Sequence, residues 1–117
     1  MMQHEHEVQK AICQYLDLRG VCYWAVPNGG QRNLVVAKKL KAEGCQPGVP
    51  DITIIHEGLY YGLEVKKPAT VGSRKGVLSL TQKAMIERIK EAGGEVAVVY
   101  SVADVIEQCI DWHMNVL

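Results

Sequence analysis

Two acidic residues, Asp51 and Glu64, stand near the open ends of two segments that should form a β-hairpin. The segments cover residues 51–56 and 59–66, and Glu57-Gly58 between them suits a two-residue turn. That turn pairs residue 56 with residue 59 and, counting back, Asp51 with Glu64. Opposed residues share one face of a sheet, with Cβ atoms roughly 4.5–5.5 Å apart. The spacing therefore predicts two carboxylates side by side at the open end of the hairpin.

Lys66 extends this pair, because it follows Glu64 by two positions and alternate residues of a strand face the same side. Two adjacent carboxylates repel each other unless a positive charge compensates them. A divalent cation such as Mg²⁺ would do so, since it typically binds one or two carboxylates together with water and substrate phosphate. The lysine ammonium could orient or deprotonate an attacking water, or neutralise charge that develops on a phosphate. These residue types in this pattern point to phosphodiester hydrolysis.

The same residues also have an ordinary interpretation. An aspartate after a proline is a common turn former, and a glutamate two positions before a lysine is typical of a solvated strand face. The apolar residues around the acids indicate a packed hairpin instead, and they are Ile52, Ile54, Leu63 and Val65. We expect Val65 to point into the core, opposite to Glu64, with its carbonyl still near the acids.

Eight periodic segments are visible in the sequence, two of which form this hairpin, and the other six must position it. Helices are expected over residues 4–19, from Asn33 to about Glu43, from Ser79 to Gly93, and after the cap at Ser101. Strands are expected over residues 21–26, 51–56, 59–66 and 96–100. The order α-β-α-β-β-α-β-α indicates an α/β fold in which helices flank a mixed central sheet.

Several short motifs between these elements allow two interpretations. Asn28-Gly29-Gly30 after a proline is more typical of a turn than of a ligand site. Ser79 and Gln82 have the spacing of a capping box, and the glutamine could also serve the acidic site in a different state. The loop of residues 67–78 is either a solvated loop or a contact for a phosphate backbone.

The length and composition indicate one globular domain over residues 1–117. The net charge is zero, from 13 Lys and Arg against 13 Asp and Glu, which excludes a uniformly basic protein. The charges are unevenly distributed, because residues 32–75 contain eight basic and four acidic residues. Three of those basic residues, Lys38, Lys39 and Lys41, are either a second phosphate-contacting strip or, as we favour, a solvated helix face.

The cysteines, the N-terminus and the hydropathy pattern indicate an intracellular, cytoplasmic protein. The four cysteines lack metal-binding spacing, which predicts free thiols in a reducing compartment. No signal peptide is visible at the polar N-terminus, and no apolar run approaches the ~18 residues of a membrane span. The histidines His4, His6, His56 and His113 are expected outside the metal site.

A longer series of motifs resembles the VRR-NUC family, whose members belong to the PD-(D/E)xK nucleases. Pro50-Asp51 followed by Glu64-Val65-Lys66 matches the short nuclease motif. The surrounding motifs occur in family order, and they are Glu5-x-x-x-Gln9, Pro27-Asn28-Gly29-Gly30, Gly48-Val49-Pro50-Asp51, Leu63-Glu64-Val65-Lys66 and Gly76-x-x-Ser79-x-x-Gln82. Val-Lys-Lys stands where the family name has Val-Arg-Arg, so this stretch does not discriminate. The resemblance covers nearly the whole chain.

The resemblance implies a restriction-endonuclease-like αβββαβ core and dependence on Mg²⁺, with Mn²⁺ able to substitute, and no organic cofactor. It implies that Asp51, Glu64 and the backbone carbonyl of Val65 bind the metal. Lys66 would be the catalytic lysine, and Gln82 would lie beside the site. Glu5 would approach the metal through water from the first helix, with Glu7 as a rival for that role.

Stand-alone family members, found in phages and bacteria, resemble structure-selective enzymes, so the expected function is metal-dependent endonuclease action on branched DNA such as four-way junctions or flaps. Cutting both strands of a junction needs two active sites, which a homodimer would supply. The final helix could form its interface or could belong to the core. The expected DNA contacts lie in the basic loop, and they are Lys67, Arg74 and Lys75. The alternatives are a non-catalytic DNA-binding or assembly module with the same fold, and RNA as the substrate.

Overall fold

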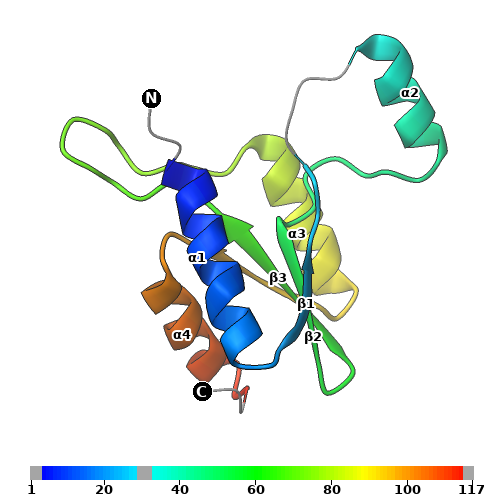
Figure 1. Ribbon diagram of the computed structural model, residues 1–117. Helices are drawn as coiled ribbons and strands as arrows, with labels where there is room; N and C mark the ends of the chain where they lie inside the picture. The colour runs from blue at the N-terminus through cyan, green and yellow to red at the C-terminus, as the bar shows by residue number, and fades with distance from the viewer. Residues whose placement is uncertain (1–3, 29–32, 115–117) are drawn as a thin grey trace.

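The computed structural model describes residues 4–28 and 33–114. Within these ranges eight elements follow one another, α1 (His4–Leu18), β1 (Cys22–Ala25), α2 (Leu34–Ala42), β2 (Ile52–His56), β3 (Leu59–Val65), α3 (Leu80–Glu91), β4 (Glu95–Val99) and α4 (Val102–Asp111). The order and type of all eight elements agree with the sequence prediction, and their ends differ from it by one or two residues. Figure 1 shows how they surround one sheet.

The sheet has the strand order β1-β2-β3-β4. Its first two pairings are antiparallel and the β3–β4 pairing is parallel, so the sheet is mixed, as predicted. The predicted hairpin register is confirmed, because His56 pairs with Leu59 and Ile52 pairs with Leu63. Both turn residues have positive φ angles, 51° at Glu57 and 79° at Gly58, as a type I′ turn requires.

Helices cover both faces of the sheet (Figure 1): α1 and α4 lie side by side against one face, and α3 lies on the other. The register explains this division, since alternate strand residues point to opposite faces. One face supplies the main core, to which β2 and β3 contribute Ile52, Ile54, Tyr61, Leu63 and Val65. The predicted orientation of Val65 is therefore confirmed, and Glu64 faces the side of α3.

The apolar side of α4 belongs to this core. Val105 is fully buried, and Val102 and Trp112 pack against the same cluster. The Trp112 ring also contacts the ring of Tyr61, with 4.8 Å between their centroids. Ile110 stays half exposed. Of the two interpretations of this helix, the core one is confirmed, and most of its apolar surface is not available for a dimer interface.

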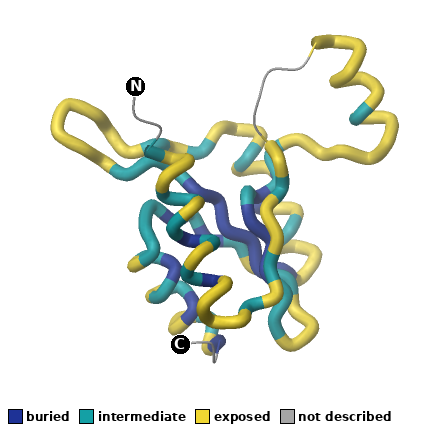
Figure 2. Tube along the Cα trace, viewed as in Figure 1, coloured by how far each residue is buried: buried dark blue, intermediate teal, exposed yellow. Residues whose placement is uncertain are grey.

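Two parts of the chain project from this body, α2 and the loop of residues 67–78. No residue of α2 is buried. Figure 2 shows both projections almost wholly exposed, in contrast to the sheet between them. Both rise from the end of the molecule at which α1 begins (Figure 1). The helices of the described ranges lack the length and apolarity that crossing a membrane requires.

Candidate active site

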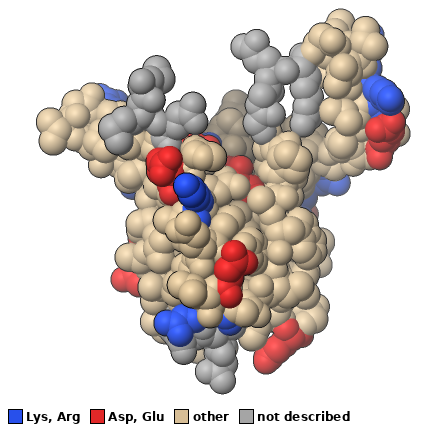
Figure 3. All heavy atoms as spheres, in the orientation of Figure 1, with Lys and Arg blue, Asp and Glu red and all other residues tan. Residues whose placement is uncertain are grey.

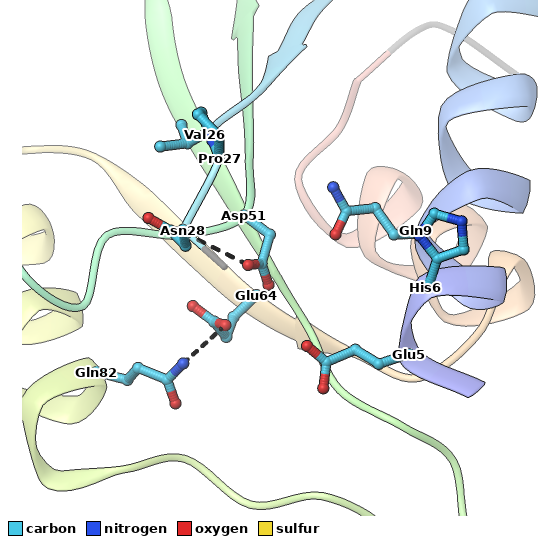
Figure 4. Close-up of a pocket in the computed structure, with 9 residues that line it drawn as sticks. All are labelled: Glu5, His6, Gln9, Val26, Pro27, Asn28, Asp51, Glu64 and Gln82. Carbon is cyan, nitrogen blue, oxygen red and sulfur yellow. Dashed lines mark hydrogen bonds between the residues drawn. The ribbon is translucent and has the colours of Figure 1, made fainter. Parts of the chain in front are cut away.

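A cavity of about 520 Å³ opens at the end of the sheet where α1 and α3 begin. Figure 4 shows how its side chains converge from several elements. The lining residues are Glu5, His6 and Gln9 of α1, Val26, Pro27 and Asn28 after β1, Asp51 before β2, Glu64 of β3 and Gln82 of α3. The two acids of the predicted hairpin thus lie in one cavity with residues far away in the sequence.

Asp51 is held by the strands on both sides of it. Its carbonyl oxygen accepts a hydrogen bond of 2.8 Å from the amide of Val26, which continues the pairing of β1 with β2. Its carboxylate oxygen Oδ2 accepts one of 2.8 Å from the amide of Val65. A backbone donor at this distance fixes a carboxylate without neutralising it. The other oxygen, Oδ1, remains on the cavity side.

Glu64 is the most constrained acid of the site, because its side chain is only 1% exposed. Its oxygen Oε2 accepts a hydrogen bond of 3.0 Å from Nε2 of Gln82. Its other oxygen, Oε1, is buried and receives no hydrogen bond from any donor in the described residues. A buried carboxylate oxygen without a donor is costly, and a cation would satisfy it.

Burial also raises the pKa of Glu64, to about 9. Side-chain hydrogen bonding with Asp51 and the negative charge of Asp51 add to the effect of burial on this pKa, the charge of Lys66 opposes it, and the charge of Glu5 contributes a smaller increase. The cause is therefore mainly the loss of water around one acid, followed by its proximity to the second. Two acids in this arrangement resist being charged together unless a cation joins them.

Gln82 performs both of the roles that the sequence allowed, and it does so in one conformation. Its side-chain oxygen accepts a hydrogen bond of 2.9 Å from the amide of Ser79, and its own amide donates one of 3.1 Å to the Ser79 hydroxyl. This is the predicted capping box. The same side chain donates to Glu64 through Nε2. The two contacts do not require the different states that the sequence analysis allowed for, because the two ends of one amide group serve the two partners.

Two glycines allow the close packing that brings Asp51 and Gln82 to the same cavity. Gly48 has a φ angle of 80°, and a Cβ there would lie 2.5 Å from the carbonyl oxygen of Thr81. Pro50 is buried over Gly62 of β3, where a Cβ would lie 2.8 Å from the proline ring. Only glycine fits either position without displacing backbone or ring. The segment before Asp51 is thereby held against both α3 and β3.

Lys66 does not line the cavity. It follows the last residue of β3, and its amide donates to the carbonyl of Val99 in β4. Its stem lies beside Gly76, where an added Cβ would be 3.3 Å from the Lys66 Cβ. The ammonium is nevertheless close enough to lower the pKa of Glu64. The predicted trio is therefore an acid pair in the cavity with a lysine beside it.

The first helix presents Glu5, and not Glu7, to the cavity (Figure 4). Glu5 is close enough to raise the pKa of Glu64 by its charge. The next turn places Gln9 on the same side, and His6 lies beside them. Sequence reasoning placed His6 outside the site, because a histidine in a polar N-terminal segment has no partner that the sequence reveals.

Asn28 is a site residue that the sequence assigned mainly to a turn. Its side-chain nitrogen donates a hydrogen bond of 2.9 Å to the carbonyl of Val49 and a longer one of 3.5 Å to Oδ1 of Asp51. It thereby links the segment after β1 to the segment before β2 and contacts the acid itself. The remaining part of that motif, Gly29-Gly30, lies outside the described residues.

Comparison with known proteins shows which fold this site belongs to. No protein-family model matches the chain, and no curated protein matches it. Among solved structures, one described as a VRR_NUC domain protein superposes with a TM-score of 0.73 and 21% sequence identity, covering 99% of this chain and 92% of the other. The chain has the fold of a VRR_NUC domain protein.

This VRR_NUC-type fold agrees with the predicted αβββαβ core. The core consists of α1, the strands β1 to β3, then α3 and β4. The remaining helix α2 is inserted between β1 and β2, and α4 follows the core. The chain on both sides of this inserted helix contributes to the cavity, since Asn28 precedes the helix and Asp51 follows it.

The donor groups of the cavity fit a hard divalent cation. Asp51 and Glu64 supply adjacent carboxylates, and one Glu64 oxygen has no donor among the residues of 4–28 and 33–114. The described residues contain no group of three or more His, Cys, Asp and Glu side chains able to hold a metal by themselves. Mg²⁺ typically uses one or two carboxylates and fills its other positions with water and phosphate. The small number of protein ligands in the cavity therefore suits Mg²⁺ and differs from the four ligands of a structural zinc site.

The three basic residues of the loop at 67–78 differ in how far they are already engaged. The Lys67 ammonium donates to the Ser73 hydroxyl at 2.6 Å and also to the carbonyl of Arg74. The Lys75 ammonium lies 5.0 Å from the centre of the Tyr100 ring. The loop is thus internally bonded, and Lys67 helps to shape it. Arg74 and Lys75 are the exposed cations of the loop.

Proposed function

We propose that the protein is a VRR-NUC nuclease that hydrolyses DNA phosphodiester bonds with a divalent metal ion, Mg²⁺ or Mn²⁺. One observation carries the proposal: a buried glutamate, Glu64, lies beside Asp51 in the cavity and has a carboxylate oxygen that receives no hydrogen bond from the residues the structure describes. An acid pair of this kind gains a large stabilisation from a cation. The shared fold supports the assignment of that cation to nuclease chemistry.

In this proposal Asp51, Glu64 and the Val65 carbonyl hold the metal, and Glu5 reaches it through water. Both acids converge on the cavity beside Glu5 (Figure 4). The bound ion would polarise the scissile phosphate and make a bound water more acidic. Lys66 then offers positive charge from beside the acids, either to orient the attacking water or to neutralise the phosphate. Gln82 keeps Glu64 in position through its hydrogen bond.

The proposed substrate is branched DNA, such as a four-way junction or a flap, and the proposed active form is a homodimer. A 117-residue chain offers little surface for reading bases. Recognition by backbone position and DNA shape needs less surface, and it suits an enzyme that selects structure. Two cuts at one junction require two active sites, which two copies supply.

The experiment is cleavage of labelled duplex, flap and four-way junction DNA, with a parallel RNA duplex, in Mg²⁺ or Mn²⁺. We expect wild-type protein to cut branched DNA and the variants Asp51→Ala, Glu64→Ala and Lys66→Ala to lose at least about 100-fold in rate. Glu5→Ala should lose less, and Glu7→Ala is its matched control because Glu7 does not line the cavity. Cleavage that survived all three main substitutions would refute the site.

The second candidate is a non-catalytic DNA-binding or assembly module. The basic residues outside the cavity would suffice for it, without any metal. It predicts that DNA is bound equally well with Mg²⁺ or with a chelator, and that no DNA form is cut by any divalent ion. The acid pair in the cavity favours the nuclease, because two neighbouring carboxylates would weaken binding of a phosphate backbone unless a metal neutralised them.

A further inference from the structure

Helix α2 is a folded element that contributes nothing to the core. Its nine residues include none that is buried. Leu34 is 70% exposed and Val35 77%, although both are large and apolar. The helix is nonetheless well formed, since Asn33 caps it by accepting a hydrogen bond of 2.8 Å from the Val36 amide. Helices this short are marginal without packing, so a role outside the body explains its presence better than stability does.

The charge of α2 is uniformly positive. Lys38, Lys39 and Lys41 lie on it, and no acid lies between its first and last residues. Lysines in the last turn partly serve the helix dipole, which accounts for Lys39 and Lys41 but not for Lys38. None of the three ammonium groups has an ion pair or hydrogen bond with any residue that the structure describes. They differ in this from Lys67, which is bonded within its loop.

The position of α2 relates it to the cavity. Asn28, which precedes the helix, and Asp51, which follows it, both line the cavity. In Figure 1 α2 stands on one side of this end of the molecule and the basic loop of residues 67–78 stands on the other. On the face that Figure 3 shows, the basic side chains of the body lie apart from one another, with uncharged and acidic surface between them. A long polyanion bound at the cavity would therefore contact basic residues on the two projections, α2 and the loop of residues 67–78.

We propose that α2, with its N-cap Asn33, is an arm that binds the phosphate backbone of duplex DNA beside the cleavage site. This inference rests on the proposed nuclease function and adds a second region of contact to it. Lys38 and Lys41 are three positions apart, so they share one side of the helix and can contact one backbone together. Such contacts release condensed counterions and position the duplex without reading its sequence.

The test is the salt dependence of binding of a blunt duplex, measured by fluorescence anisotropy in Ca²⁺, which need not support cleavage. The variant is Lys38→Gln/Lys41→Gln. Its control is Arg19→Gln/Lys90→Gln, which removes the same charge from the ends of α1 and α3 remote from the cavity. We expect the arm variant to bind roughly tenfold more weakly near 0.1 M salt, with a log–log slope shallower by about 2, one unit for each lost phosphate contact. The control should keep the wild-type slope.

Equal slopes for the arm variant and the wild type would overturn the inference. A second copy of the chain is the competing occupant of α2. If Leu34→Ser/Val35→Ser converts a sedimenting dimer to a monomer while the lysine variant binds DNA normally, the arm serves that copy and our inference is wrong. Thermal unfolding checks that each variant is folded, and no large change is expected because α2 buries nothing.

The two proposals fail separately. If the wild-type protein cuts DNA and the lysine variant keeps the wild-type salt dependence of binding, the nuclease proposal stands and the arm proposal is wrong. If the lysine variant has the shallower salt dependence but the wild-type protein cuts nothing in Mg²⁺ or Mn²⁺, the arm proposal stands and the nuclease proposal is wrong. Wild-type protein that binds no duplex at low salt overturns the arm directly.

Discussion

The acids of the site differ in what surrounds them. Asp51 is half-buried and accepts hydrogen bonds at both carboxylate oxygens, from the amide of Val65 and the side chain of Asn28. Glu64 is buried, and within the described part of the chain only one of its oxygens has a donor. The cost of charging the site therefore falls mainly on Glu64, whose pKa is raised to about 9.

This difference predicts a pH dependence of stability in the metal-free protein. The folded-state pKa of Glu64, about 9, lies above its ordinary value of 4.5, so folding favours the protonated form. Its stabilising contribution is complete below the ordinary pKa and is lost as the pH rises toward 9. In a chelator, we expect the midpoint of thermal unfolding to fall between about pH 5 and pH 9 more steeply for wild type than for Glu64→Gln.

The comparison with Glu64→Gln isolates this group, because glutamine keeps the shape but does not titrate. Added Mg²⁺ should raise the wild-type midpoint near pH 8 and leave that of the variant almost unchanged. Parallel pH profiles of the two proteins would show that the buried carboxyl is not the source.

Asn28 donates a hydrogen bond to Asp51, one of the two acids that we propose bind the metal. Replacing Asn28 with alanine removes the donor to the Val49 carbonyl and to Oδ1 of Asp51. Groups that orient a metal ligand are typically worth about 10- to 100-fold in affinity. We expect Asn28→Ala to weaken Mn²⁺ binding, measured calorimetrically, by about tenfold. Asn33→Ala is the control, since Asn33 only caps α2. Equal affinities in the two variants would contradict a positioning role.

At the scale of elements, the approach of the segment before β2 to the start of α3 decides whether the site forms. Gly48 lies at the point of contact. We expect Gly48→Ala to lower the free energy of unfolding by about 1–2 kcal/mol for its left-handed backbone and by a further ~1–3 kcal/mol for overpacking. Chemical denaturation measures both, and Mn²⁺ affinity should fall as well.

Gly72→Ala is a matched control for this substitution. Gly72 also has a φ angle of 80°, but nothing lies within 4 Å of an added Cβ. It should therefore show the backbone cost alone and leave metal binding unchanged. If both variants lost the same stability, close packing against Thr81 would not be the reason for glycine at position 48.

The capping box of α3 separates helix stability from site geometry. Ser79→Ala removes a cap and should cost about 1 kcal/mol of unfolding free energy, with the cleavage rate kept. Gln82→Ala removes the reciprocal cap and also the donor to Glu64, so it should lower both stability and the cleavage rate. If the cleavage rate fell in both variants only in proportion to the loss of stability, Gln82 would act only as a helix cap.

At the scale of the whole molecule, the chain is a flat body with projections, 43 by 40 by 23 Å along its principal axes. The core uses most of the apolar face of α4, so a homodimer must use other surface. We expect wild-type protein to sediment as a dimer. Mixed dimers of wild type and Asp51→Ala should cut one strand of a four-way junction, leaving nicks in gel analysis. If mixed dimers cut both strands of the junction, the hypothesis that each protomer's active site cuts one strand would be contradicted.

The fold and the acid pair were predictable because their causes are local or periodic. Alternating apolar residues and a Glu57-Gly58 turn determine the hairpin register, and the register alone places Asp51 opposite Glu64. The caps at Asn33, Ser79 and Ser101 follow from local hydrogen bonding and were all predicted. The same local reasoning gave each helix its ends but could not say what the helix packs against.

The order of elements, the mixed sheet and the pair of acids on one strand face follow from periodicity and turn chemistry, which act over a few residues. The folded structure was needed to show that Glu64 is buried, with one oxygen that receives no hydrogen bond from the described residues, and that Lys66 lies beside the cavity. It was also needed to show that Asn28 contacts an acid 23 positions away and that α2 leaves the core. These features depend on which distant segments pack together, because burial and long-range contacts arise only when the whole chain has folded.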